Sequence, residues 1–541
     1  MSQLRELPEG WIWASLEQIA DIQGGIQKQP KRQPQKNVFP YLRVANVLRN
    51  KLDLTEVHEI ELFGDELEKL RLKTGDLLVV EGNGSPSQIG RMAVWDGSIK
   101  NCVHQNHIIR ARLSDQMSPA FVAAYWNSQE GSEYVKQVAS STSGLYTLNV
   151  SKVGHLSVPV IPLAEQHRIV AEIDTQFTRL DAVVIALKRV QTNLKRYRAS
   201  VLKAACTGHL VPTEAELTRA EGRSYESADQ LLQRILQSRR AEWEAEQLAA
   251  IQAAGKAPKD DKWKSKYRES VKPDTSELPE LPEGWVWSSL GAIAGVQLGK
   301  MLSPKAYEDG LLQLPYLRNE NIRWGWINFD DIKKMGFKKH ELERYSIEPY
   351  DLIVCEGGEA GRCAVYTGVA GQFMYQKALH RVRPVGHLVI PYFIQFCIQH
   401  YVHSGTVIPK PSETTIQHLP LEKMQILPIP LPPLDEQHRI VAEVERRLSV
   451  IDELEATIAT NLKRADRLRQ AILKRAFEGN LVPQDPTDEP ASVLLARIRA
   501  EHEQAREKPK ATPQQTNAHK PSVQPKAATP VQGELALEFR E

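Results

Sequence analysis

The sequence predicts an α/β (α+β) protein with two globular mixed α/β domains separated by two long antiparallel coiled-coil helices, as a pseudo-two-fold tandem repeat. Three observations predict this fold class. The stretch PLAEQHRIVAEID at 162–174 returns as PLDEQHRIVAEVE at 433–445. Each copy opens a run of apolar residues alternately three and four apart, which is the spacing of a coiled coil. The segments before each copy also repeat, and they have the alternation and β-branched content of short strands.

The repeated segments of the two domains follow each other in the same order, which indicates duplication of a whole domain. LPEGWIWASLEQIA at 7–20 matches LPEGWVWSSLGAIA at 281–294, PYLRVANV at 40–47 matches PYLRNENI at 315–322, and GDLLVVEGNGSPSQIGRMAVW at 75–95 matches YDLIVCEGGEAGRCAVY at 350–366. Successive prolines in LSVPVIPLAEQ and ILPIPLPPLDEQ end the domains, because proline interrupts both helix and central strand. We therefore expect domains at 1–160 and 281–432.

Each domain is followed by one of the long helices, expected within 161–215 and 433–479. The first helix is expected to run from about His167 to Ala205, and Gly208 and Gly479 follow the two helix ends, where glycine is favoured. Because both helices belong to one chain, we expect them to pair with each other. The seam residues predicted from the heptad spacing are Leu180, Val183, Leu187, Val190, Leu194, Tyr197 and Val201 in the first helix, and Ile451, Leu454, Ile458, Ala465, Leu468 and Ile472 in the second.

Two further segments complete the chain. Residues 216–280 predict a charged helical segment and then a linker rich in Lys, Pro and Ala from about 252. Residues 480–541 predict a second charged helix and a disordered tail, with the apolar GELALEF at 533–539 either solvated or docked on a partner.

Composition excludes several classes of protein. A length of 541 residues predicts two to four folded units. Five cysteines, none in a CxxC pair, indicate reduced thiols in a cytoplasmic protein rather than disulfides or a zinc site. The start MSQLRELPEGW has no signal sequence, and no apolar run approaches about 18 residues, so secretion and membrane spanning are not expected.

The sequence offers no catalytic or metal-binding constellation. The [DNS]PP[YFW] turn of the adenine and cytosine methyltransferases does not occur, and LPPL at 431–434 lacks both flanking residue types. GSPSQIGRM at 84–92 has Arg-Met where a phosphate-binding loop needs Lys-Ser/Thr. His104 and His107 have no further metal ligands at a workable spacing. The glycine-rich stretches 81–85 and 356–361 are interpreted as turns, or as loops brought close to a ligand backbone.

The distribution of basic residues favours DNA as the ligand. Residues 22–51 contain seven Lys and Arg residues and no Asp or Glu, although the whole chain is close to neutral at +2. The helices and domain starts agree closely between the repeats, while the loops at 22–39 and 296–314 share almost nothing. A duplicated scaffold with diverged loops would read two different short sequences across an unread gap, with Lys and Arg contacting phosphates and Asn, Gln and Arg contacting bases.

With its two EQHR motifs, its two GDLLVVEGNGS and YDLIVCEGG cores and its two heptad helices, the sequence resembles a specificity subunit of a type I restriction-modification system, over nearly the whole chain to about residue 480. The resemblance implies two target-recognition domains that read the halves of an asymmetric bipartite site, with the paired helices as a molecular ruler. It implies docking of two methyltransferase subunits on the helices, later joined by restriction (motor-nuclease) subunits. No cofactor is expected on this chain, and S-adenosylmethionine, ATP and magnesium would belong to the partners.

The candidate DNA-contacting residues lie in loops that flank expected strands, and they combine phosphate-binding with base-reading side chains. In the first domain they are Lys28, Gln29, Lys31, Arg32, Lys36, Arg43, Asn46, Asn83, Ser85, Gln88, Arg91, Gln105, Asn106, Ser141, Ser143 and Tyr146. In the second they are Lys300, Ser303, Lys305, Arg318, Asn319, Asn321, Arg323, Glu359, Arg362, Gln376, Lys377, Lys410, Ser412 and Thr414. Two alternatives stay open: a fused modification enzyme, and a non-catalytic protein-protein scaffold with a coiled-coil spacer.

Overall fold

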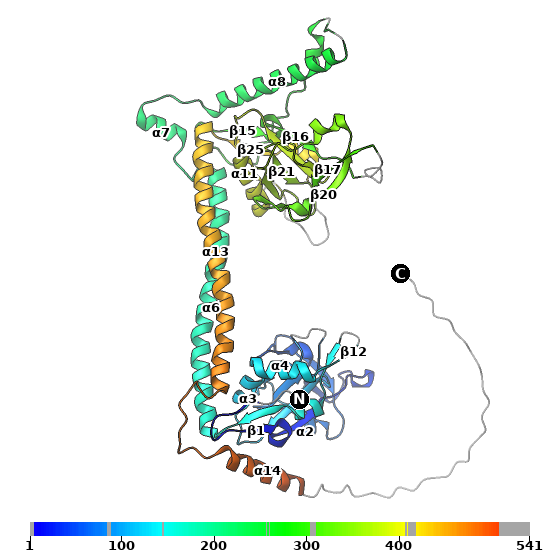
Figure 1. Ribbon diagram of the computed structural model, residues 1–541, viewed down its shortest axis with the longest axis vertical. Coiled ribbons are helices and arrows are strands. Elements are labelled where there is room, and N and C mark those ends of the chain that lie inside the picture. Colours follow the sequence, from blue (N-terminus) through cyan, green and yellow to red (C-terminus); the bar gives the residue numbers. More distant parts are fainter. Residues whose placement is uncertain are drawn as a thin grey trace, which may run out of the picture. The chain divides into compact units, whose positions relative to one another are not determined.

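The computed structural model describes residues 5–83, 88–142, 145–255, 257–258, 260–302, 310–405, 408 and 418–507. It divides into two compact units, Met1–Arg179 with Arg467–Glu541, and Leu180–Asp466. Each unit contains one mixed α/β domain, part of one long helix and part of the other (Figure 1). The predicted fold class is confirmed. The GELALEF segment lies outside the described residues.

The first domain is built on a four-stranded antiparallel sheet in the order β2-β11-β7-β9. The strand β7 (Leu77–Val80) is buried throughout because its alternate side chains enter two different cores: Leu77 and Val79 on one face, Leu78 and Val80 on the other. This accounts for an apolar run without alternation. The other strands and helices of this domain are β1 (Ile12–Ser15), α1 (Leu16–Ile19), β2 (Ala20–Gly24), β3 (Val38–Leu42), β4 (Val47–Leu48), β5 (Lys51–Leu52), β6 (His58–Glu61), α2 (Glu66–Leu70), β8 (Gly82–Asn83), β9 (Met92–Val94), β10 (Val103–His104), β11 (Ile108–Leu113), α3 (Pro119–Trp126), α4 (Gln129–Val138), β12 (Ser140–Thr142), β13 (Leu145–Thr147), α5 (Val150–Gly154) and β14 (Ser157–Val160).

The second domain repeats this topology with the sheet β16-β24-β21-β22, and its central strand β21 (Leu352–Cys355) also divides its side chains between two cores. One smaller sheet also corresponds directly, since β1 pairs with β14 as β15 pairs with β25. The three-stranded sheet β12-β13-β8 of the first domain has no counterpart among the described strands of the second. The elements of this domain are β15 (Val286–Ser289), α9 (Leu290–Ile293), β16 (Ala294–Leu298), β17 (Leu312–Leu317), β18 (Ile322–Arg323), β19 (Trp326–Ile327), β20 (Lys333–Phe337), α10 (Leu342–Tyr345), β22 (Cys363–Val365), β23 (Met374–Tyr375), β24 (Leu379–Pro384), α11 (Pro391–Ser404), α12 (Leu421–Gln425) and β25 (Pro428–Leu431).

The long helices are α6 (Leu163–Cys206) and α13 (Leu434–Phe477), each of 44 residues. Both begin directly after a proline whose carbonyl accepts the first helical hydrogen bond, from Gln166 N to Pro162 O and from Gln437 N to Pro433 O. The first helix therefore begins a few residues before the expected start at about His167, because proline is tolerated where a helix begins. The second begins at Leu434, within the expected range 433–479.

The two helices pair antiparallel in both units. In the first unit the Arg469 guanidinium of α13 lies 4.9 Å from the ring centroid of Phe177 on α6. In the second unit Arg198, further along α6, pairs with Asp452 and Glu455, which come earlier in α13. Residue numbers thus rise along one helix where they fall along the other.

One line of the predicted seam is wrong by a single residue. The other line of the predicted seam is buried. Leu194 of α6 packs with Ile451 and Ile458 of α13, and Leu187 lies against this cluster. Val201 and Ala465, each seven residues further along, are also buried. Leu180 and Ile472 are half-buried. Five other predicted seam residues, Val183, Val190, Tyr197, Leu454 and Leu468, are 44% to 53% exposed. The residue after each one is half-buried instead: Val184, Gln191, Arg198, Glu455 and Arg469. At some of these positions the two helices contact each other through charged side chains, such as Arg198 and Arg469. A search for apolar residues therefore selected the residue before the one that faces the other helix.

The helices that follow α6 and α13 pack on the domain of the other repeat. After α6 come α7 (Glu214–Glu221) and α8 (Ala228–Ala253), and Leu231 and Ile235 of α8 enter the core of the second domain. After α13 comes α14 (Ala491–Glu507), whose Leu494 and Ile498 enter the core of the first domain. Each domain is thus completed by a helix from the opposite repeat.

Part of the expected linker is folded. The 3-10 helix Asp261–Lys266 lies against α8, where the Trp263 ring stacks on Trp243 with 6.1 Å between centroids. None of the described helices is long and apolar enough to cross a membrane.

Candidate nucleic-acid interface

The acid-free segment of the first domain carries its lysines outward. Lys28, Lys31 and Lys36 are exposed and form no ion pair with any residue that the structure describes. Arg32 differs, because it forms a forked pair with Glu66 at 2.7 and 2.8 Å. That hydrogen bond holds the pKa of the Glu66 carboxyl below its usual value. A hollow of about 500 Å³, lined among others by Lys28 and Gln29, lies at the base of this segment.

The asparagines of the PYLRVANV and PYLRNENI motifs hold their own loops together. Asn46 is buried; it accepts a hydrogen bond from Arg43 N at 2.8 Å and donates to the Asp53 and Glu56 carbonyls, each at 2.8 Å. Asn321 is buried in the same way and accepts from Arg318 N at 2.9 Å. The prediction that these two residues read bases is wrong, because the amide of each is fully used inside the protein.

The arginines near them are largely engaged as well. Arg318 forms ion pairs with Glu320 and Asp331, and Arg43 pairs with Glu56 at 3.3 Å. Arg91 donates to the Val44 carbonyl at 2.9 Å, and at the corresponding position Arg362 donates to the Asn319 carbonyl at 2.8 Å. These contacts brace the same loop in both domains.

The loop that follows the first strand of each main sheet passes close to a second group of candidates. Ile26 bridges to Gln105 in the first domain, and Lys300 bridges to Gln376 in the second. The approach leaves no room for a side chain at Gly25 or Gly299, where a Cβ would clash with backbone oxygens of Gln105 or Gln376. The structure thus brings Lys300, Gln376 and Lys377 together, and the Lys377 N–H donates to the Lys300 carbonyl at 2.6 Å.

The remaining candidates divide by exposure and by partner. Gln88 and Lys377 are exposed. Glu359 is exposed and pairs with Arg362 at 2.8 Å, and Lys300 pairs with Glu341 at 2.5 Å. The half-buried candidates are Gln29, Gln105, Asn106, Tyr146, Asn319, Arg323 and Gln376. Ser85, Ser143, Ser303, Lys305, Lys410, Ser412 and Thr414 lie outside the described residues, and the side chains of Asn83 and Ser141 are not among those described.

No metal-binding or nucleophilic group stands out. The described residues contain no cluster of three or more His, Cys, Asp or Glu side chains that could hold a metal ion. All five cysteines are free thiols and buried. Burial raises the pKa of Cys102 to about 12 and that of Cys355 to about 11, so these thiols stay protonated near neutral pH.

Two repeated motifs to which the sequence assigned no role meet in the structure. The tryptophan of LPEGW donates its indole N–H to the glutamate of EQHR in both units, from Trp11 to Glu165 at 3.1 Å and from Trp285 to Glu436 at 2.9 Å. The adjacent glutamines also anchor each domain, since Gln166 accepts from Ser118 N and Gln437 accepts from Ile390 N. The recurrence of both motifs at matching places was the signal for this contact.

Comparison with known proteins shows what the chain is similar to. Residues 282–464 match the model of the type I restriction modification DNA specificity domain. The chain is 22% identical over 515 residues to the EcoBI specificity subunit of Escherichia coli, covering 92% of this chain and 94% of that protein. It is 23% identical over 514 residues to the EcoKI specificity subunit of Escherichia coli strain K12, covering 92% and 96%.

A solved chain from a study of the assembly of the type I R-M system shares the fold, with a TM-score of 0.60, 17% identity and coverage of 88% of this chain and 100% of that chain. This likeness shows a common fold. The chain thus carries a match to the type I restriction modification DNA specificity domain at 282–464 and is similar, over nearly the whole length of each relative, to type I restriction enzyme specificity subunits.

Proposed function

We propose that the chain is the non-catalytic DNA-specificity subunit of a type I restriction-modification complex, and that each domain reads one half of an asymmetric bipartite DNA site. The observation that carries this proposal is the contrast between scaffold and loops. The two domains share their sheet order and their bracing contacts, whereas their loops at 22–39 and 296–314 are unrelated in sequence. Two domains with the same scaffold but unrelated binding loops are expected to bind two different half-site sequences.

Outward lysines support phosphate contact in the first domain. Lys28, Lys31 and Lys36 have exposed ammonium groups, and neutralising phosphates with such groups releases counterions and gives salt-dependent affinity. In the second domain Gln376 and Lys377, held next to Lys300, combine a base-reading amide with a phosphate-binding cation. The corrected set of base readers therefore omits Asn46 and Asn321.

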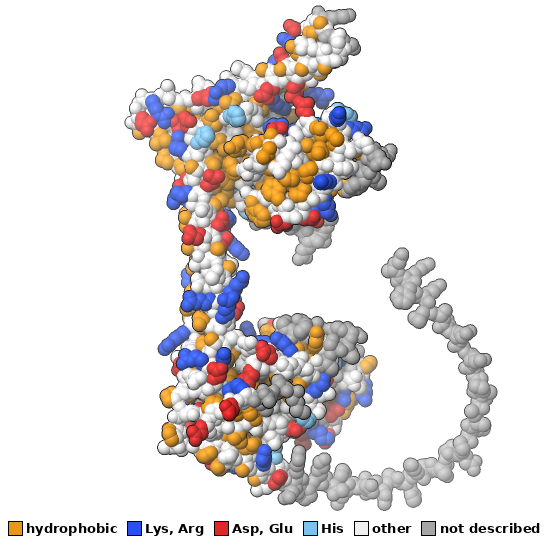
Figure 2. Space-filling view, in the orientation of Figure 1, with side chains coloured by type: hydrophobic (Ala, Val, Ile, Leu, Met, Phe, Trp, Pro, Cys, Tyr) orange, Lys and Arg blue, Asp and Glu red, His pale blue; other side chains and the backbone are white. Residues whose placement is uncertain are grey.

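The paired helices would set the length of the unread gap and bind two methyltransferase subunits. Side chains on their outer face support such docking, because Val183, Ile185 and Val190 of α6 are exposed among charged side chains, as are Val450 and Leu454 of α13. Figure 2 shows apolar patches alternating with charged ones along the paired helices. A monomeric helix pair would leave these apolar side chains in water, whereas helices of a partner would bury them.

The chemistry would belong to the partners. Methyltransferase subunits would supply S-adenosylmethionine, and restriction subunits, joining through them, would supply the ATP- and magnesium-dependent motor and nuclease. Because the substrate is chromosomal and invading DNA, we place the complex in the cytoplasm of a bacterium or archaeon.

Methylome sequencing tests the proposal. Cells that carry this chain with its methyltransferase partner should show one methylated bipartite motif that disappears when the chain is deleted. Exchanging residues 21–155 for the corresponding loops and strands of another specificity subunit should change one half of the motif only. The absence of salt-dependent binding to duplex DNA would favour a protein-protein scaffold, and methyl transfer by the purified chain alone would favour a fused enzyme. Either result would overturn this assignment.

A further inference from the structure

One tryptophan in the first unit contacts both long helices. The residue is Trp11, whose indole N–H donates a hydrogen bond to the Glu165 carboxylate in the first turn of α6. Both side chains are buried. The same ring lies beside Gly479, the second residue after the end of α13 at Phe477. A Cβ on that glycine would be 3.8 Å from the Trp11 ring and only 2.6 Å from the ring of Pro8. The start of one helix and the end of the other therefore meet at this indole.

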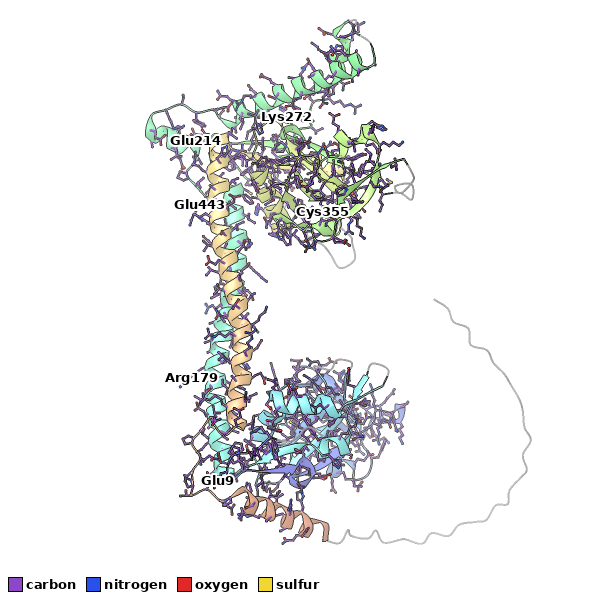
Figure 3. All side chains as sticks on the ribbon, in the orientation of Figure 1. Glu9, Arg179, Glu214, Lys272, Cys355 and Glu443 are labelled. Carbon is purple, nitrogen blue, oxygen red and sulfur yellow. The ribbon has the colours of Figure 1, made fainter. Side chains whose placement is uncertain are left out.

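The second unit repeats this joint with the helices exchanged. Trp285 donates to Glu436 in the first turn of α13 and lies 3.3 Å from the position of a Cβ on Gly208, just after the end of α6. The other oxygen of Glu436 accepts the backbone N–H of Glu214 at 2.8 Å. Figure 3 shows Glu214 next to the start of α13. Trp11 and Trp285 lie 274 residues apart, at the same place in the two repeats, and make the same contacts to the helix ends.

The buried carboxyl groups and the rigid indole rings leave little freedom in the geometry of this contact. Burial raises the pKa of both Glu165 and Glu436, so each carboxyl needs its indole donor to be held in an apolar setting. An indole has few rotatable bonds, and its N–H points in one direction only. Gly208 and Gly479 have φ of +71° and +73°, so a larger residue would be strained there as well as crowded.

We propose that Trp11 and Trp285 are positioning residues: each fixes the orientation of its recognition domain on the adjoining helix ends, and thereby decides how strictly the complex selects the length of the unread gap. The inference rests on the proposed function, because a gap has meaning only for a bipartite reader. It concerns spacing alone, since neither indole lies in the loops that carry the candidate base readers.

The chain offers matched controls in Trp13 and Trp287, which lie two residues after Trp11 and Trp285, in strands β1 and β15. Their indole N–H groups donate to backbone carbonyls near their own domain starts, from Trp13 to Arg5 at 3.1 Å and from Trp287 to Pro279 at 3.2 Å. They therefore test the loss of an indole hydrogen bond that does not go to the first turn of a long helix. A second variant, Glu165→Gln, keeps an oxygen acceptor for Trp11 and should behave as the wild type.

The experiment uses the full chain in complex with its methyltransferase subunit. Duplexes selected from a random library by the wild type are remade with the gap one base pair shorter and one longer, and affinities are measured for the wild type, W11F, W285F, W13F and W287F. W11F and W285F should lower the preference for the selected gap by about five-fold, the effect of losing one hydrogen bond of ordinary net strength. The sequence of each half-site should not change, and W13F and W287F should keep the wild-type preference.

Each outcome separates the two proposals. If W11F and W285F weaken all three duplexes equally, or act no differently from W13F and W287F, the tryptophans only stabilise the fold and the positioning role is wrong. If W11F fails to fold, as judged by circular dichroism, Glu165→Leu replaces it and the same comparison with Glu165→Gln decides. If the wild type selects no bipartite duplex at all, the proposed function fails first.

Discussion

At the scale of single residues, Asn46 and Asn321 occupy the same place in the two domains and make equivalent hydrogen bonds. Replacing Asn46 with alanine would remove one acceptor and two donations, and it would leave the Arg43 N–H and the Asp53 and Glu56 carbonyls without that partner. Leaving buried backbone groups unpaired costs about 1 to 3 kcal/mol. We expect N46A to lower the thermal unfolding temperature of the first domain while the methylated motif keeps both halves.

The control for this prediction is Asn106→Ala, because Asn106 is half-buried in a neighbouring loop. That variant should leave the unfolding temperature nearly unchanged. A changed half-site in N46A at unaltered stability would restore Asn46 as a base reader. The sequence could not distinguish the two roles, since an asparagine beside an arginine in a loop has the same letters whether its amide turns inward or outward.

At the scale of elements, the two long helices differ from their sequence pattern in one respect that stability can test. Leu194 is buried between them, whereas Val190 is 45% exposed. Truncating a buried leucine to alanine costs about 2 to 5 kcal/mol, but truncation of an exposed side chain changes stability by about 0.5 kcal/mol or less. We therefore expect L194A to lower the midpoint of denaturant unfolding clearly and V190A to leave it unchanged.

A comparable loss of stability in both variants would mean that the seam predicted from sequence, which contains both residues, is correct. Heptad spacing could predict the existence and approximate length of these helices, because a stripe of period seven recurs in both. It could not choose between Tyr197 and Arg198, because the structure fills that seam position with an arginine that pairs with Asp452 and Glu455. The same holds for Val190 and Gln191, where the half-buried side chain is polar. The central strands were easier to predict from sequence, because a strand such as β7 has apolar side chains on both faces and appears as a continuous apolar run.

At the scale of the whole molecule, the duplication was readable from sequence but the exchange of helices between repeats was not. Likeness between α8 and α14 says that both segments are helical, and it says nothing about which domain each one covers. Burial decides that question: Leu231 joins the core of the second domain and Leu494 joins that of the first. The candidate site was predictable to the level of loops, whereas the direction of each side chain depended on partners distant in sequence, such as Glu66 for Arg32.

The length of the helix pair provides the last prediction. Duplicating residues 188–194 in α6 together with 452–458 in α13 would add one heptad to each helix and keep both seams in phase. Seven residues add about 10 Å, which is the rise of about three base pairs. The joints at Trp11 and Trp285 and the loops of both domains are untouched, so methylome sequencing should show both half-sites unchanged with a gap about three base pairs longer. Three base pairs also turn the duplex by about 100°, so affinity should fall.

A control with the heptad in α6 alone would put the seams out of register and should abolish methylation. An unchanged gap in the double insertion would mean that the helices do not set the spacing.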